Sequence, residues 1–132
     1  MSGSDLTSTY RSVRTRAVRR GRRSPTFPEL TSIVEQLDPR CSDCQIDGRS
    51  LRALRVHDRF GRRVVRLTLT LVDADGEYVA GNLEWACFKC VEIREIATPS
   101  EAIELGTAIG AVWRRCLGLA SVSPTSGQVQ TG

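Results

Sequence analysis

The chain has 132 residues, of which 19 are basic and 15 acidic, so its formal net charge is +4. This length predicts one domain, and a content of 40% hydrophobic but only 5% aromatic residues predicts a modest core that would gain from a bound metal. The sequence contains no apolar run of the roughly 18 residues that span a bilayer, and no apolar segment typical of a signal peptide, so we expect an intracellular protein without a membrane partner.

Residues 1–27 are rich in Gly, Ser, Thr and Arg and offer few apolar side chains, so we predict a disordered basic arm. Its charge lies in a run without an acidic residue, formed by Arg11, Arg14, Arg16, Arg19, Arg20, Arg22 and Arg23. Arms of this kind bind phosphate backbones by releasing counterions, so these arginines are candidates for nucleic-acid binding. A solubilising tail and a transit peptide are the alternatives for the same run.

Residues 28–37 are predicted to form a short helix. Pro28 suits the first helical position, and apolar residues recur at helical spacing on one face, at Leu30, Ile33, Val34 and Leu37. The Asp38-Pro39 dipeptide then ends the helix, because the residue before a proline is disfavoured in the α region.

Two CxxC pairs, Cys41 with Cys44 and Cys87 with Cys90, flank the middle of the chain. Each pair directs two thiolates at one point, and two pairs complete the tetrahedral set of ligands that Zn²⁺ prefers. Because no ligand position stays open, this arrangement predicts a structural rather than a hydrolytic zinc ion.

Other uses of these cysteines fit the sequence less well. Disulfides require an oxidising compartment, a thioredoxin-like site uses one CxxC pair, and iron–sulfur clusters have different spacings. A fifth cysteine, Cys116, repeats at helical spacing with Leu105, Ile109 and Val112, so we interpret it as a core residue.

Between the cysteine pairs, residues 51–57 and 62–72 are predicted to be strands joined as a hairpin by residues 58–61. The second strand alternates leucine and valine with arginine and threonine, which is typical of a strand with one buried face. Residues 77–79 are predicted to add a third short strand.

The rest of the chain is predicted to be helical. A helix opens at the second cysteine pair and runs through residues 91–96, and a capping box of Thr98 and Glu101 starts another that Gly118 can end. Gly106 and Gly110 on this helix would let a second backbone approach closely. We therefore predict a small α+β treble-clef zinc domain with a β-hairpin and flanking helices over residues 28–120, and a disordered tail over 121–132.

The stretch from Cys41 to about residue 96 resembles the HNH, or ββα-metal, nuclease family. Many members carry a CxxC pair, a strand ending in Val-Asp-His or Val-His-His, an Asn-Leu dipeptide and a second CxxC pair. The matching pieces here are the two cysteine pairs, residues 54–58 and the Asn82-Leu83 dipeptide.

The resemblance implies cleavage of phosphodiester bonds with the help of a divalent ion such as Mg²⁺ or Mn²⁺. Matched by position, Asn82 is the family's asparagine, His57 is the residue that binds the ion, and Asp58 stands where the general-base histidine is expected. A carboxylate is a weak base toward water at neutral pH, and His57 is the only histidine of the chain.

We therefore expect a zinc-stabilised protein that binds nucleic acid, DNA rather than RNA, with weak or no cleavage. The first alternative is an active HNH endonuclease that uses His57, Asp58 and Asn82. The second is a zinc-stapled protein–protein adaptor that docks through Gly106 and Gly110. The compact size and an arginine-rich composition, in which Lys89 is the only lysine, would suit a phage gene.

Overall fold

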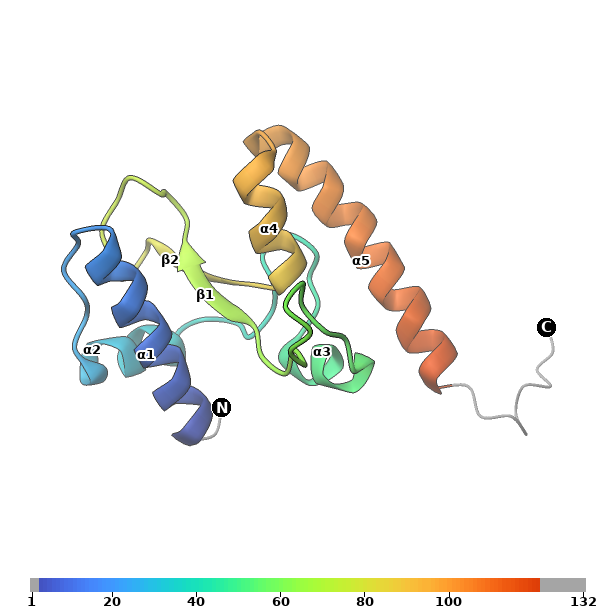
Figure 1. Ribbon diagram of the computed structural model, residues 1–132, viewed down its shortest axis with the longest axis horizontal. Coiled ribbons are helices and arrows are strands. Elements are labelled where there is room, and N and C mark those ends of the chain that lie inside the picture. Colours follow the sequence, from blue (N-terminus) through green and yellow to red (C-terminus); the bar gives the residue numbers. More distant parts are fainter. Residues whose placement is uncertain (1–2, 122–132) are drawn as a thin grey trace.

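The computed structural model describes residues 3–121, which form a small α+β fold (Figure 1). The predicted tail, apart from Ser121, lies outside the described residues. The elements in chain order are α1 (Gly3–Arg19), α2 (Phe27–Glu35), α3 (Gly48–Leu54), β1 (Thr68–Leu71), β2 (Leu83–Ala86), α4 (Phe88–Ile96) and α5 (Pro99–Ser121). None of the described helices is both long and apolar enough to cross a membrane.

The sheet consists of β1 and β2, which pair antiparallel with Leu69 opposite Trp85 and Leu71 opposite Leu83. All four of these side chains are buried, while Thr68 and Thr70 alternate with the leucines and are less covered. The predicted alternation is therefore confirmed, although the strand covers only residues 68–71 of the 62–72 predicted. Its partner is the segment directly before the second cysteine pair.

The predicted hairpin partner, residues 51–57, is not a strand: that prediction was wrong because residues 48–54 form α3. Asp47 is the N-cap of this helix, and its Oδ1 accepts a hydrogen bond of 2.7 Å from the backbone N–H of Ser50. Residues 77–79, predicted as a third strand, form none, although Tyr78 is buried there.

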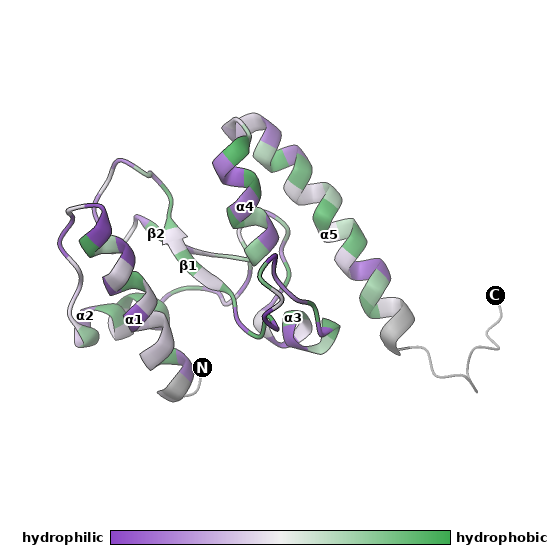
Figure 2. Cartoon of the chain, viewed as in Figure 1, coloured by the Kyte–Doolittle hydropathy of each residue, from purple (hydrophilic) through white to green (hydrophobic). Residues whose placement is uncertain are grey.

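The basic arm predicted for residues 1–27 is also corrected, because residues 3–19 form helix α1 and pack on the core. Val13 and Ala17 are 0% exposed, and the ring of Tyr10 meets that of Phe27 edge-on with centroids 5.4 Å apart. Tyr10, Val13 and Ala17 recur at intervals of three and four, but arginines surround them and mask the apolar stripe in the sequence. Hydrophilic and hydrophobic residues accordingly lie interleaved along α1 (Figure 2).

The helix predicted at residues 28–37 is confirmed as α2. It begins with a capping box in which Thr26 Oγ1 accepts from the N–H of Glu29 at 3.3 Å and the Glu29 carboxylate accepts from the N–H of Thr26 at 2.8 Å. Leu30 is its fully buried residue.

The two helices predicted after the second cysteine pair are confirmed as α4 and α5. Thr98 and Glu101 form the predicted capping box, with hydrogen bonds of 3.2 and 2.8 Å. Helix α5 continues past Gly118 to Ser121; it packs against α4 and α3, and its C-terminal end projects from the molecule (Figure 1). Cys116 lies on it partly buried, outside the main core.

Gly106 and Gly110 face inward, so they are not a docking face for a partner as the adaptor hypothesis assumed. A Cβ added at Gly106 would lie 2.8 Å from the Cβ of Asp43, and one added at Gly110 would lie 2.7 Å from the carbonyl oxygen of Cys44. The two glycines let α5 pack directly on the backbone of the first cysteine turn.

We expect Gly110→Ala to lower the free energy of unfolding by about 1–3 kcal/mol, because the added methyl group meets a backbone carbonyl rather than a flexible side chain. Gly118→Ala is the matched control, since a Cβ there meets nothing within 4 Å and alanine favours a helix. Denaturant unfolding of the zinc-loaded protein measures both effects. A Gly110→Ala variant as stable as the parent would contradict this packing.

Candidate metal centre and nucleic-acid surface

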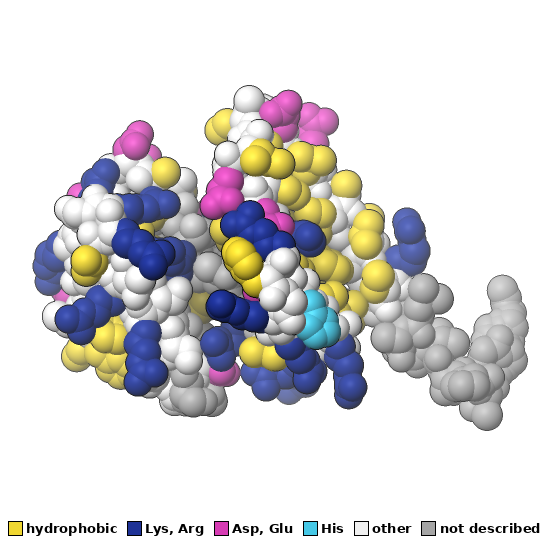
Figure 3. Space-filling view, viewed as in Figure 1, with side chains coloured by type: hydrophobic (Ala, Val, Ile, Leu, Met, Phe, Trp, Pro, Cys, Tyr) yellow, Lys and Arg dark blue, Asp and Glu magenta, His cyan; other side chains and the backbone are white. Residues whose placement is uncertain are grey.

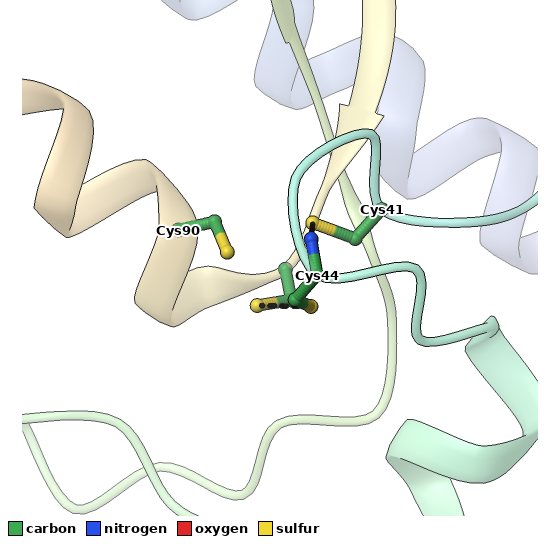
Figure 4. A group of neighbouring side chains, drawn as sticks. Cys41, Cys44 and Cys90 are labelled. Atoms are coloured by element: carbon green, nitrogen blue, oxygen red, sulfur yellow. Dashed lines mark hydrogen bonds between the residues drawn. The ribbon is translucent and has the colours of Figure 1, made fainter. Parts of the chain in front are cut away.

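The four cysteines of the two CxxC pairs meet in the centre of the fold. Cys41 and Cys44 lie in the loop after α2, Cys87 follows β2, and Cys90 lies in the first turn of α4, with the sulfurs directed toward one another (Figure 4). All four are buried, and one ligand atom from each lies within 4.8 Å of the others.

The sulfur positions fit a tetrahedral metal site. Four sulfurs at 2.3 Å from a zinc ion are about 3.8 Å from one another, and the Sγ atoms of Cys44 and Cys87 are 3.6 Å apart. That separation is far longer than the roughly 2.05 Å of a disulfide bond, and all five cysteines are free thiols. The cluster therefore fits a structural metal, with no ligand position left for a substrate.

The electrostatics of the cluster also favour a cation. Hydrogen bonding from the thiol of Cys44 holds the pKa of Cys41 well below its ordinary value. A hydrogen bond with Cys41 raises the pKa of Cys90, so the protons of the cluster are shared among closely spaced sulfurs. A divalent ion at the centre compensates the charge of several thiolates at once.

The first cysteine turn is attached to the sheet and to α4. The backbone N–H of Ser42 donates to the carbonyl of Trp85 at 2.9 Å, which links the turn to β2. Asp43, inside the CxxC pair, receives two hydrogen bonds of 2.8 and 3.0 Å from the guanidinium of Arg94. Arg94 also reaches Glu84 on β2 at 2.9 Å.

This three-residue network joins the loop, β2 and α4 on one side of the metal cluster. Its members are partly buried, with side-chain exposures of 23% for Arg94, 15% for Asp43 and 24% for Glu84. Burial alone would lower the pKa of Arg94, but the hydrogen bonds that it donates to Asp43 and the charge of Glu84 outweigh burial and raise this pKa. Sequence reasoning missed the network, although an acid inside the CxxC pair and an arginine one turn after the last ligand were visible signals.

His57 and Asp58 lie in the connection between α3 and β1. His57 is exposed and forms an isolated β-bridge with Arg63. Asp58 caps the turn that follows it, and its Oδ1 accepts from the N–H groups of Phe60 and Arg62 at 2.9 and 3.0 Å. The hydrogen bond from Arg62 is the main reason that the pKa of Asp58 is lowered.

Asn82 lies in the loop between β1 and β2 and holds that loop together. Its Oδ1 accepts from the N–H of Asp73 at 2.8 Å, and its Nδ2 donates to the carbonyls of Asp73 and Glu77 at 3.2 and 2.9 Å. Glycine is required at residue 76, because a Cβ there would lie 2.5 Å from the Nδ2 atom of Asn82.

Asn82 and Asp58 lie at opposite ends of the two-stranded sheet. Asp58 lines a cleft together with Thr68 and Phe88, at the start of β1, whereas the carbonyl of Asn82 accepts from Val72, just past the end of β1. Four residues of strand separate those ends, which corresponds to about 13 Å at roughly 3.3 Å per residue.

The seven arginines predicted to bind nucleic acid all belong to α1 or to the residues just after it. Arg22 pairs with Glu77 at 2.8 Å and Arg23 with Glu29 at 3.1 Å. Arg16 is partly buried, and its Nη2 donates to Ser12 Oγ at 3.0 Å. Within residues 3–121 no ion pair is recorded for the four exposed arginines Arg11, Arg14, Arg19 and Arg20.

Comparison with known proteins supports the fold. No protein-family model matches the sequence, and no curated protein matches it. Among solved structures, the chain matches the rare-cutting HNH restriction endonuclease PacI with a TM-score of 0.68 and 24% sequence identity, over 83% of this chain and 80% of that one. That structure concerns a mechanism of DNA perturbation by PacI. The resemblance to the HNH scaffold is thus confirmed at the level of the fold.

We expect the freshly purified protein to hold one zinc ion per chain and to lose both the ion and its cooperative unfolding transition when Cys44 or Cys87 becomes serine. Metal affinity and folding are coupled in sites of this kind, so removing one thiolate removes much of the folding free energy. Cys116→Ser is the control, because this thiol lies outside the cluster. Elemental analysis and circular dichroism measure the outcome, and a Cys44→Ser variant with full zinc content would contradict the site.

Proposed function

We propose that this protein is a zinc-stabilised, intracellular nucleic-acid-binding protein built on an HNH nuclease scaffold, with DNA as its partner and weak or no cleavage. The observation that carries the proposal is the group of exposed arginines on α1, attached to a fold shared with an HNH restriction endonuclease. Zn²⁺ at the four cysteines is part of the proposal, because four buried thiolates without an open position suit that ion.

The charge distribution supports binding to a polyanion. Arg11, Arg14 and Arg19 of α1 and Arg20 just after it are exposed, whereas exposed acids gather where α4 joins α5, at Glu95, Glu101 and Glu104. In the space-filling view, basic side chains spread over the α1 side and acidic ones lie near the top of α4 and α5 (Figure 3). A phosphate backbone that contacts the basic side releases counterions and gains affinity without reading sequence.

The residues that follow β1 support weak cleavage. Strand β1 leads into the loop held by Asn82, and this loop begins with Val72-Asp73-Ala74. In the Val-Asp-His pattern of the family, alanine then stands in the position of the histidine. We infer that Ala74 is the altered catalytic position. The hypothesis that His57 and Asp58 carry the chemistry stays a prediction, and the lowered pKa of Asp58 makes it a poorer base.

We expect Arg11→Gln combined with Arg19→Gln to weaken binding to duplex DNA. The slope of log K against log salt should decrease by about 1.8, since each phosphate contact contributes about 0.9. Arg23→Gln is the matched control, because its charge is already paired with Glu29, and it should change the slope little. Fluorescence anisotropy at several salt concentrations measures the slopes. Equal slopes for parent and double variant would contradict a role for α1.

We expect the parent to nick supercoiled plasmid slowly or not at all with Mg²⁺ or Mn²⁺, and Ala74→His to nick it at least about tenfold faster. A general base typically contributes about 10²–10⁴-fold, and partial recovery is the conservative expectation. Asp58→His is the comparison, because it adds the same imidazole at the other end of the sheet.

Robust cleavage by the parent, abolished by His57→Ala, would instead establish the active endonuclease. Gel-based nicking assays with all four proteins separate these outcomes.

A further inference from the structure

The turn between α3 and β1 exposes an aromatic ring. Phe60 is 70% exposed, whereas Phe27, the other exposed phenylalanine among the described residues, is 39% exposed and packs against Tyr10. Burying a phenylalanine stabilises a protein by about 1.5–3 kcal/mol, so an uncovered ring forgoes that gain.

The turn that presents Phe60 is rigid. Asp58 Oδ1 accepts from the N–H groups of Phe60 and Arg62, and the backbone N–H of Asp58 donates to the carbonyl of Arg62 at 2.9 Å. Gly61 has a φ of +79°, a conformation that favours glycine, and its N–H donates to the carbonyl of Asp58 at 3.0 Å. The backbone that carries the ring is therefore ordered before any partner arrives, which lowers the entropic cost of binding.

Positive charge surrounds the ring. The guanidinium of Arg59 lies 5.1 Å and that of Arg62 5.8 Å from the ring centroid, and Arg63 follows directly. Beside the turn, Arg62 and Arg63 line a cleft of about 260 Å³ together with Ser8, Ser12 and Arg16 of α1. Hydroxyl and guanidinium groups of this kind bind phosphate oxygens. Arg19 lies about one helical turn beyond Arg16 and extends the basic surface along α1.

We propose that residues 58–63 form a nucleic-acid contact in which Phe60 stacks on an unpaired base of single-stranded DNA. Arg59 and Arg62 contact the phosphates on either side of that base. An aromatic platform between cations binds single strands with little sequence preference, because every base offers a π face and every nucleotide a phosphate. The exposed ring supplies a stacking contact, which arginine–phosphate contacts do not provide. This inference rests on the proposed nucleic-acid function and places the base at the turn between α3 and β1.

The test compares Phe60→Ala, Phe60→Trp and Arg59→Gln with the parent, on a fluorescent single-stranded DNA of mixed sequence and on dextran sulfate, a polyanion without bases. Phe60→Ala should weaken binding to the DNA about tenfold, as loss of one stacking side chain does, with an unchanged salt slope. It should bind dextran sulfate like the parent. Arg59→Gln should lower the salt slope on both ligands. Ile96→Ala, which trims another exposed apolar side chain, is the control and should change neither.

Phe60→Trp adds a direct readout. Its added emission, after subtraction of the parent's signal, should be quenched by the single strand and not by dextran sulfate, because only a stacked base quenches the indole.

Unchanged DNA affinity in Phe60→Ala, or an equal loss on both ligands, would overturn the stacking contact alone. A parent that binds no nucleic acid at any salt concentration would overturn the proposed function together with this inference.

Discussion

The fold depends on the meeting of two cysteine turns that are far apart in the sequence. Zinc binding to four thiolates is worth about 10–16 kcal/mol in small domains, and the net stability of a whole domain is about 5–15 kcal/mol. A zinc ion bound to these cysteines would therefore contribute a free energy as large as the whole net stability of such a domain. The sheet is only two short strands, which would not persist alone. Cys87 directly after β2 and Cys90 in the first turn of α4 connect that sheet and that helix to one centre.

A metal fixes four sulfurs but leaves the elements around them free to rotate. Arg94 removes part of that freedom, because its planar fork fits Asp43 in one orientation while it also reaches Glu84. Half-buried ion networks add little net stability. We therefore infer that this network mainly fixes how the first cysteine turn, β2 and α4 are oriented relative to one another. Gly106 and Gly110 further restrict the first cysteine turn, because they let α5 lie directly on its backbone.

Local chemistry made part of this structure predictable. The CxxC pairs, the capping box at Thr98 and the alternation around Leu69 each determine a feature within a few residues, and each was confirmed. The strand pairing was harder to predict, because a short stretch such as residues 51–54 suits a helix or a strand, and the cap at Asp47 favours the helix. The strand predicted at residues 51–57 also underlay the match of His57 and Asp58 to the family's histidine positions, whereas β1 leads to the proposal that Ala74 holds that position. The spacing of Gly106 and Gly110 indicated a close backbone approach, but only tertiary packing shows that the approaching segment is the first cysteine turn of the same chain.

Helix α1 packs against the core with one side and presents arginines to solvent with the other. Val13 and Ala17 face the core, whereas Arg11, Arg14 and Arg19 face solvent, and the last-turn arginines and Asp5 in the first turn agree with the helix dipole. Substitutions on the outer side therefore alter the electric field around the molecule and leave its interior unchanged. The attraction of the molecule to a polyanion can therefore be tuned at these positions without any cost to the packing of the core.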